Sequence, residues 1–459
     1  MAAEKPGSQR VSLPALEATV VAESDVVVVG GGPAGVSAAV AAARSGASVS
    51  LVERYPYLGG LAAGGMVLVL DDMANGDEIT VAGIAQEYVE RLERLGLAVY
   101  PPPHERVRSK AAWDRWGRWG TFDLYGRGRL KSIVYAVAFD PDGWKRVSND
   151  LIREHRINLR LHSFFNQALM DGNAITGVVC DTKAGPEAVR GRVVIDATGD
   201  ADVAAAAGAS FVQSRYLTTT VFRLGGVDAS RAEEFESQDP AEAARLNRRA
   251  RRILGGSWGL WWLKTPIPGI VWCNCPHMTG YDGLDVRDLT EAELEGRQRI
   301  SALLDYAREC LPGFESAYIV DVAPQIGVRQ TRLLRGEYVV TKQDILERRH
   351  FHDSIARGRD YYTPYRALLP VEVEQLLVAG RHYSADPDAQ KISREIPPCM
   401  AMGQAAGIAA VEALDCRLLL REIDVRQVQR KLRQQGADPG DVPSANASLE
   451  AGLGTPAPT

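Results

Sequence analysis

The sequence predicts an α/β fold, in which a parallel sheet assembled from separated segments carries an inserted, mixed α+β domain. Three observations predict it. An apolar strand pattern, a glycine-rich turn and an alanine-rich helix follow one another over residues 25–45. Two later apolar runs, near residues 195 and 378, each end in a turn with glycine. The stretches between them hold short, alternating strands, which are typical of a different sheet.

The first turn has the pattern G-x-G-x-x-G directly after the strand at residues 25–29. Gly30 permits the tight turn, Gly32 lets the backbone approach a pyrophosphate, and Gly35 lets the following helix pack closely on the strand. The helix expected from Pro33 directs free N–H groups and the positive end of its dipole toward such a phosphate. This pattern predicts a phosphate-binding turn.

The next strand, "SVSLVE", ends in Glu53, 18 residues after Gly35. A carboxylate at this place can accept hydrogen bonds from both ribose hydroxyls of an adenosine and would repel a 2′-phosphate. The strand, turn, helix, second strand and acid together predict a dinucleotide-binding site that does not take NADP.

Later segments return to the same sheet. We expect a helix near Gly143–His155 and a hairpin around Asp171–Asn173. "RVVIDATGD" predicts a buried parallel strand followed by a helix at residues 201–207. "QLLVAGR" (375–381) predicts another strand, and the small residues of "PPCMAMGQAAGIAAVEAL" (397–414) favour a closely packed helix.

The remaining segments have another character. "TTTVFRLGGV" and "GIVWCNCPHM" predict strands, and "TEAELEGRQRISALLDYARECLPGF" predicts an amphipathic helix that ends at Pro312-Gly313. We therefore divide the chain into nucleotide-domain segments 24–75, 143–215 and 346–435, substrate-domain segments 76–142 and 216–345, and a mobile tail at 436–459.

Composition and charge exclude several classes of protein. The chain has 459 residues, of which 46% are hydrophobic and 24% charged, enough for two domains with sizeable cores. A net charge of −5 gives no general attraction to nucleic acid or anionic lipid. Neither a run of about 18 apolar residues nor a signal-peptide pattern is present, so we expect a cytoplasmic protein with no membrane partner.

The six cysteines are too sparse for a disulfide scaffold. Cys273 and Cys275 form the only close pair, and two cysteines cannot complete a structural zinc site, although His277 could join them. We expect no metal and buried packing cysteines; the alternative is a redox-active dithiol beside a redox cofactor.

The chain resembles the FAD-dependent oxidoreductases of the glutathione-reductase-like flavoprotein superfamily, related to the fumarate reductase and thiazole-synthesis flavoproteins. The resemblance spans residues 24–415 and is carried by six motifs: "DVVVVGGGPAGVSAAVAAARSGASVSLVER", "LGGLAAGG", "FDPDGWKRVSNDLI", "VVIDATGDADVAAAAG", "PQIGVRQTRLLRGEYVVTKQDIL" and "LLVAGRHYSADPDAQKISREIPPCMAMGQAAG". It implies a Rossmann-like FAD-binding domain of the GR2 type and FAD as the cofactor.

The resemblance also implies roles for individual positions. The first turn should hold the pyrophosphate and Glu53 the ribose, while a helix that begins at Gly403 should point at the flavin pyrimidine. The full set of expected cofactor-binding residues is Gly30, Gly32, Pro33, Ala34, Gly35, Glu53, Arg54, Gly59, Gly60, Leu61, Ala197, Gly199, Asp200, Gly380, Arg381, Gly403, Gln404 and Ala405.

Arginines in the last two motifs are candidates for substrate binding. Arg329 and Arg332 would share one face of a helix but lie on opposite faces of a strand. Arg394 could hold a substrate carboxylate by two parallel hydrogen bonds, or steady the negative charge of the reduced flavin. The alternative is an interface ion pair with Glu337 or Glu395.

We predict catalytic roles for Arg394, His382 and Arg329. A neutral His382 imidazole could remove a hydroxyl proton while a hydride goes to flavin N5; the alternative is a histidine bonded to local backbone. Cys399 would lie where a helix N-terminus lowers a thiol pKa, or would simply pack.

These observations predict an FAD-dependent oxidoreductase that transfers a hydride between a small organic substrate and flavin N5. Only one G-x-G-x-x-G lies in a strand context, so the substrate or an external donor would reduce the flavin. One alternative is an electron-transfer subunit with a redox partner or a homo-oligomer. The other is a flavin-binding RNA-processing component, which would use the arginine cluster at 245–252, although we expect no nucleic-acid partner.

Overall fold

The computed structural model describes residues 11, 17–124, 126, 128, 130–256 and 258–450. Its largest sheet has seven strands in the order β8-β2-β1-β11-β10-β9, with β24 also paired to β11. The strands are β1 (Thr19–Val29), β2 (Val49–Val52), β8 (Asn158–Arg160), β9 (Phe164–Asp171), β10 (Ala174–Thr182), β11 (Gly185–Asp196) and β24 (Leu376–Val378).

Five of these strands run parallel at the centre of the sheet. β1 lies between β2 and β11 and is parallel to both, β8 extends the sheet beyond β2, and β24 pairs with the end of β11 at residues 194–196. Val26, Val27 and Val28 are fully buried, which explains the apolar run in the sequence. Because parallel strands end at one edge of a sheet, the turns after β1, β2, β11 and β24 lie close together.

The first half of β11 pairs antiparallel with β10, which pairs with β9. The β9–β10 hairpin turns at Gly172, whose φ of +60° suits glycine, and the predicted hairpin is confirmed. The antiparallel pairing ends at Arg190, and the part predicted at "RVVIDATGD" is parallel to β1 and, from Val194, to β24. The predicted buried parallel strand is therefore confirmed.

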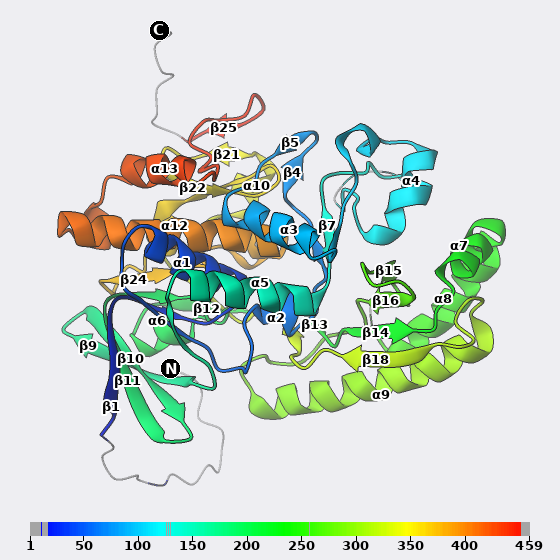
Figure 1. The fold of residues 1–459 in the computed structure, drawn as a ribbon, viewed down its shortest axis with the longest axis horizontal. Coiled ribbons are helices and arrows are strands. Elements are labelled where there is room, and N and C mark those ends of the chain that lie inside the picture. Colours follow the sequence, from blue (N-terminus) through cyan, green and yellow to red (C-terminus); the bar gives the residue numbers. More distant parts are fainter. Residues whose placement is uncertain are drawn as a thin grey trace.

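Two helices pack directly against each other over one face of the sheet (Figure 1). They are α1 (Pro33–Arg44) and α12 (Ile396–Cys416). A Cβ at Gly403 would lie 2.0 Å from the Ala34 carbonyl oxygen, and one at Gly407 would lie 2.2 Å from the Ala38 carbonyl oxygen. The small residues seen in the sequence thus serve a close helix–helix contact.

Two further helices cover the same layer: α3 (Ile84–Arg94) and α5 (Pro141–Glu154). α5 confirms the helix expected near Gly143–His155 and begins at Pro141 because Asp140 caps its first turn. Tyr88 of α3 and Trp144 of α5 stack in the core shared with the main sheet.

The inserted segment has a sheet of its own (Figure 1), in the order β15-β16-β14-β18. Its strands are β14 (Phe222–Gly225), β15 (Trp262–Lys264), β16 (Ile270–Cys273) and β18 (Tyr318–Val322). The helices α7 (Ala229–Gln238), α8 (Pro240–Leu254) and α9 (Val286–Cys310) pack on it around a second apolar core. The expected amphipathic helix is confirmed as α9, which ends before Pro312-Gly313.

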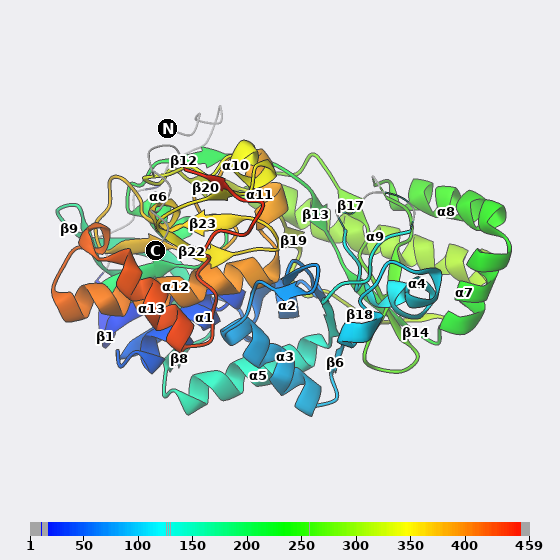
Figure 2. The ribbon, with the colours of Figure 1, turned by 90° about the horizontal axis from the view of Figure 1, so that it is seen from above.

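A smaller three-stranded sheet of the inserted segment lies between the four-stranded sheet and the main sheet (Figure 2). Its order is β17 (His277–Met278), β13 (Thr218–Thr219) and β19 (Gly327–Val328). Another three-stranded sheet joins β3 (Val69–Leu70), β7 (Val137–Phe139) and β6 (Ala98–Val99). Helix α4 (Lys110–Trp116) forms a separate aromatic cluster with Phe122. The domain boundaries drawn from the sequence stay predictions.

Shorter elements complete the described fold. They are α2 (Gly60–Ala63), β4 (Ala74–Asn75), β5 (Glu78–Ile79), η1 (Pro103–Glu105), η2 (Gly117–Trp119), α6 (Asp202–Ala206), β12 (Phe211–Gln213), β20 (Arg332–Leu334), α10 (Lys342–Leu346), β21 (Arg349–His350), β22 (Ser354–Arg357), β23 (Tyr362–Pro364), η3 (Tyr365–Leu368), α11 (Pro387–Ser393), η4 (Leu420–Glu422), α13 (Val425–Gln434) and β25 (Ser448–Leu449).

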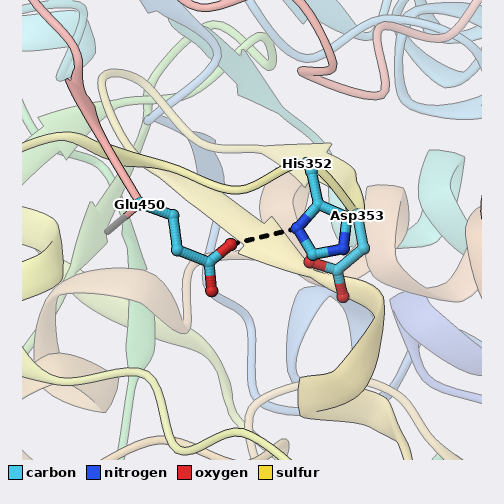
Figure 3. A group of neighbouring side chains, drawn as sticks. All are labelled: His352, Asp353 and Glu450. Atoms are coloured by element: carbon cyan, nitrogen blue, oxygen red, sulfur yellow. Dashed lines mark hydrogen bonds and ion pairs between the residues drawn. The ribbon is translucent and has the colours of Figure 1, made fainter. Parts of the chain in front are cut away.

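The expected mobile tail is anchored over residues 438–450. Asp438 pairs with Arg357 at 2.7 Å, and β25 pairs with β21. Glu450 approaches His352 at 3.1 Å (Figure 3). Residues 451–459 of that prediction lie outside the described residues. Among the described residues, no helix is long and apolar enough to cross a membrane.

Candidate functional site

A cavity of about 610 Å³ lies at the carboxyl edge of the central strands. Its walls come from the turns after β1, β2, β11 and β24 and from the start of α12. Such crevices, outside the carboxyl ends of parallel strands, are where open α/β sheets bind ligands. Among the predicted cofactor residues, those that line it are Gly30, Gly32, Pro33, Ala34, Glu53, Arg54, Gly60, Leu61, Ala197, Gly199, Asp200, Gly380 and Arg381.

The three glycines of the first turn are required for different reasons. A Cβ at Gly30, where φ is +103°, would lie 2.4 Å from the Ala197 carbonyl oxygen, and one at Gly35 would lie 1.8 Å from the Gly30 oxygen. The protein's own packing therefore excludes side chains at these two positions. A Cβ at Gly32 would meet only the Gly60 Cα, at 3.9 Å. The open space above Gly32, at the N-terminus of α1, fits a phosphate group.

Glu53 ends β2 and is held by backbone donors. Its carboxylate accepts hydrogen bonds from the Gly31 N–H at 2.6 Å and the Tyr55 N–H at 2.8 Å. Burial raises the pKa of the Glu53 carboxyl, and these N–H groups offset only part of that shift. The side chain lines the cavity, as expected of a group that receives ribose hydroxyls.

Asp200 forms a buried ion pair at the cavity wall. Its carboxylate lies 2.9 Å from an Arg381 nitrogen and accepts a hydrogen bond from the Thr331 hydroxyl at 2.6 Å. Burial alone would raise the pKa of the Asp200 carboxyl, but the Arg381 charge and the Thr331 hydrogen bond lower it overall. Arg332 donates to the Asp200 carbonyl and to the Asp202 carboxylate, at 2.9 and 2.8 Å. This network joins the turn after β11 to the segment that follows β24.

His382 lies beneath the cavity, and no part of its side chain is exposed. Its Nε2 lies 3.1 Å from an Asp196 carboxylate oxygen, and it is not among the residues that line the cavity. Burial raises the pKa of the Asp196 carboxyl, but the contact with His382 lowers it, and the net shift is downward. Asp196 is therefore an ionised carboxylate that accepts a hydrogen bond donated by His382 Nε2. The placement favours a structural role for His382 over proton exchange with a substrate.

The start of α12 faces the cavity, but not at the predicted residues. The helix begins at Ile396, so the prediction that a helix begins at Gly403 is wrong. Gly403 packs on α1, Gln404 accepts a hydrogen bond from the Ile84 N–H at 3.0 Å, and Ala405 is fully buried. Ile396 and Cys399 line the cavity instead.

Gly35 and Gly59 are also absent from the cavity wall among the described residues. Gly59, with φ of +110°, turns the chain against the Trp144 ring, where a Cβ would lie 2.6 Å from Cδ1. Both glycines shape the turns that carry neighbouring lining residues.

A group of polar side chains also lines the cavity. Arg394, Glu395 and Gln325 line it beside Cys399. The Arg394 guanidinium lies 3.5 Å from the Glu395 carboxylate, which is the ion pair named as an alternative in the sequence. The Nε of Arg394 and the Oε1 of Gln325 are buried without a hydrogen-bond partner within the described part of the chain. Such atoms are expected where a ligand supplies the missing partner.

Cys399 does not have the lowered pKa expected at a helix N-terminus. Burial raises the pKa of its thiol to about 12, and the S–H donates to the Arg394 carbonyl at 3.4 Å. The thiol is therefore protonated at neutral pH, which favours the packing role.

Arg329 lies in a second polar group, next to the small sheet. It follows β19, whereas Arg332 begins β20, so the two do not share a helix face. Arg329 donates to His277 Nε2 at 2.8 Å. An arginine cannot accept, so the neutral imidazole carries its proton on Nδ1, which is buried without a partner among the described groups. Burial, Arg329 and Arg394 lower the pKa of His277 to about 3.

Sequence reasoning did not identify Gln325 or the Arg329 contact of His277. Gln325 is drawn to the cavity because its N–H donates to the Gly64 carbonyl at 3.1 Å, a contact across 261 positions of sequence. The signal available in the sequence was the polar residue directly before "IGVRQTR" in a motif already singled out.

Other candidates in the sequence have structural surroundings. Burial raises the pKa of the Cys275 thiol to about 12 and that of the Cys273 thiol well above its usual range, and both lie in the core of the inserted segment. The arginines at 245–252 lie on the exposed face of α8.

One group of possible metal ligands, His352, Asp353 and Glu450, is drawn in Figure 3. Asp353 accepts two hydrogen bonds from Arg366 at 2.9 Å, and Glu450 accepts one from the same guanidinium at 2.9 Å. Arg366 therefore already pairs with both carboxylates, and the group ties the C-terminal strand to the fold.

Comparison with known proteins places this site in a family. A model of the family described as "FAD dependent oxidoreductase" matches residues 25–360 and 357–432. A stretch of 59 residues is 52% identical to fumarate reductase (cytochrome) from Shewanella frigidimarina, covering 12% of this chain and 10% of that protein. A longer match, 27% identical over 320 residues, is to 6-methylpretetramide 4-monooxygenase from Streptomyces rimosus and covers 66% of this chain and 65% of that protein.

The chain thus spans about a tenth of the fumarate reductase and just under two thirds of the monooxygenase. Among solved structures, a geranylgeranyl bacteriochlorophyll reductase-like protein from Thermoplasma acidophilum matches with a TM-score of 0.48 and 15% identity, over 90% of this chain and 83% of that one. The family match confirms FAD as the predicted cofactor.

Proposed function

This chain belongs to the FAD dependent oxidoreductase family, and we propose that it transfers a hydride between a small organic substrate and N5 of FAD. FAD, when bound, supplies the two-electron acceptor, and the protein supplies binding, orientation and electrostatics. Gly30, Gly32 and the start of α1 would hold the pyrophosphate, and Glu53 the adenosine ribose.

The observation that carries the proposal is one cavity lined by two different sets of groups. The glycine turn and Glu53 line it, and so do Arg394, Glu395 and Gln325. A ligand bound at the glycine turn therefore shares the cavity with the side chains of Arg394 and Gln325, which have polar atoms without partners among the described residues. The sequence holds a single dinucleotide turn, which supports direct reduction by the substrate over reduction by a bound nicotinamide.

Arg394 would orient the substrate in the part of the cavity lined by polar side chains. Its guanidinium lies on the cavity wall, and the Glu395 contact at 3.5 Å leaves most of its five N–H donors free to bond an oxygen-bearing group. We assign the exchange of the substrate hydroxyl proton to Glu395, which lines the cavity, in place of His382, which does not.

The test is anaerobic bleaching of the flavin by a panel of small metabolites, with wild type and with Arg394→Ala. We expect Arg394→Ala to slow flavin reduction at least about a hundredfold while FAD affinity changes less than about threefold. Arg394→Lys should restore little of the rate, because an ammonium lacks the planar fork. Arg430→Ala, on the exposed outer side of α13, is the matched control.

Equal losses of flavin reduction and FAD affinity in Arg394→Ala would instead assign Arg394 to the cofactor. Flavin reduction by a partner protein alone, and by no small molecule of the panel, would overturn the proposal in favour of an electron-transfer subunit. Purified protein that retains nucleic acid would favour an RNA-processing role.

A second reaction is favoured by the Streptomyces rimosus relative, which is a monooxygenase by name and matches 66% of this chain. In that reaction one atom of O₂ would enter the product, the other would leave as water, and an external hydride donor would supply the two electrons by way of FAD. Mass spectrometry of the product made under ¹⁸O₂ separates the two: hydride transfer leaves the product unlabelled, and monooxygenation labels it.

A further inference from the structure

A second cavity, of about 620 Å³, lies in the inserted segment, away from the FAD cavity. It is bounded by α7 and α8, by the residues that lead into β15, and by the turn after α9. Figure 1 shows these elements gathered at one end of the molecule. The volume is within the range of small-molecule sites, about 300–1,000 Å³. We call it the aromatic cavity.

Large rings supply much of its wall. Trp258 and Trp261 meet edge to face, with ring centroids 5.8 Å apart, and Trp262 and Phe314 do so at 5.9 Å. Trp258 is 45% exposed although it is a large apolar side chain. Flat ring faces and edges suit a planar aromatic ligand, which gains from stacking and edge-to-face contact beyond its buried area.

The polar groups of this cavity are already paired. Among the described residues that line it, only Arg118 and Glu236 carry charge, and they form an ion pair with each other. The Arg118 guanidinium also lies 4.2 Å from the centre of the Trp262 ring and donates to the Trp262 carbonyl at 3.1 Å. Burial lowers the pKa of Arg118 to about 10. A charged ligand would find no unpaired countercharge here, and its desolvation would be unfavourable.

One contact leads from the aromatic cavity toward the small sheet. Trp258, on the cavity wall, packs at a tilt against the His277 ring, with centroids 4.5 Å apart. His277 in turn accepts a hydrogen bond from Arg329. Neither His277 nor Arg329 is among the described residues that line the two cavities.

We propose that the aromatic cavity binds an uncharged, planar aromatic molecule at a site separate from the cavity of the glycine turn. Binding at Trp258 and Trp261 requires no redox step, so this inference goes beyond the proposed function and does not rest on it.

The test uses the FAD-loaded full-length protein and 2-naphthalenemethanol as the probe, with equilibrium dialysis as the readout. We expect the aromatic alcohol to bind at least about tenfold more tightly than decahydro-2-naphthalenemethanol, its saturated and non-planar counterpart, and than the anion 2-naphthoate. Preference for the anion, or equal affinity for the saturated alcohol, overturns the proposal.

Two variants locate the binding. Ala243 lines the cavity from α8, so Ala243→Trp fills part of its volume, and we expect at least about a tenfold loss of probe affinity. Ala241→Trp, an exposed position on the same helix that does not line the cavity, should stay within about twofold of wild type. Probe binding that Ala243→Trp leaves unchanged overturns the assignment to this cavity.

Flavin absorbance under anaerobic conditions separates the two proposals. Probe binding that Ala243→Trp weakens, together with bleaching by compounds of the panel, supports both. Probe binding in the cavity with no bleaching by any compound of the panel contradicts the proposed function and leaves the binding site. Bleaching by non-aromatic compounds alone, without probe binding, overturns the aromatic cavity and leaves the proposed function.

Discussion

The glycine turn after β1 and the aromatic cavity differ in which atoms form their surfaces. At the turn, backbone atoms form the surface: side chains are excluded at Gly30 and Gly35 by contacts under 2.5 Å, and Gly32 leaves its space open. In the aromatic cavity, the rings of Trp258, Trp261 and Trp262 form the surface, and the one charged pair is internal. A backbone surface can hold a group common to many enzymes, whereas a side-chain surface can vary with the substrate.

The largest effect expected is at Gly32, where the comparison is sharpest. Gly32→Val should abolish FAD binding, because the side chain would occupy the open space at the start of α1. The backbone there, with φ of −74° and ψ of −174°, accepts any residue, so the fold should survive. Flavin absorbance of the purified protein and its circular dichroism are the two measurements.

The matched control for Gly32→Val is Gly172→Asn, at the tip of the β9–β10 hairpin, where φ is +60° and a Cβ meets nothing within 4 Å. Asparagine tolerates this conformation, so the control should retain FAD. A yellow Gly32→Val protein would show that the space above Gly32 does not hold the pyrophosphate.

The next effect is on stability, at the buried pair of Asp200 and Arg381. Asp200→Asn should lower the free energy of unfolding at pH 7 by about 3 kcal/mol, because Arg381 stays buried without its partner charge. Asp388→Asn removes an exposed carboxylate paired with Lys391 and should leave the free energy of unfolding close to that of wild type, because solvent screens this pair. Urea unfolding followed by tryptophan fluorescence measures both.

The same pair predicts a pH dependence. The pKa of Asp200 is lowered in the fold, so its contribution is complete above the ordinary aspartate value of about 3.9 and is lost as pH falls through the lowered folded value. The difference between wild type and Asp200→Asn should therefore shrink only in acid. A difference that is constant down to the lowest pH at which the protein stays folded would contradict the ion pair.

The smallest effect concerns the inserted segment, where a redox dithiol was the alternative to packing. Cys273 and Cys275 are buried with raised pKa values, so neither should react with a thiol reagent in the folded protein, and Cys275→Ser should leave the flavin spectrum unchanged. Exposed Cys416 should react first, and Cys416→Ser should remove that first phase. Rapid labelling of Cys273 or Cys275 would reopen the dithiol alternative.

The main sheet and its first turn were predictable from the sequence because their signals are local. The apolar run of β1, the glycine spacing and Glu53 lie within about 30 residues, and each reports a constraint on its own backbone. The start of α12 was also readable: Pro397 and Pro398 are typical of a first helical turn, yet the resemblance suggested Gly403.

The polar side chains around this cavity could not be predicted in the same way. Arg394, Arg329 and His382 were all reasonable candidates, since each lies in a family motif. The structure brings Arg394 to the cavity, Arg329 to His277 and His382 to Asp196. Each partner comes from a distant part of the chain, so no spacing rule identifies it.

The sequence alone determined the cofactor turn of this protein, because a glycine pattern records where backbone must lie against backbone or against a phosphate. The tertiary structure alone decided which polar side chains line the cavity at that turn and that a second, aromatic cavity exists. Those properties depend on side chains from separate segments meeting in space, and long-range contacts leave no periodic trace in the order of residues.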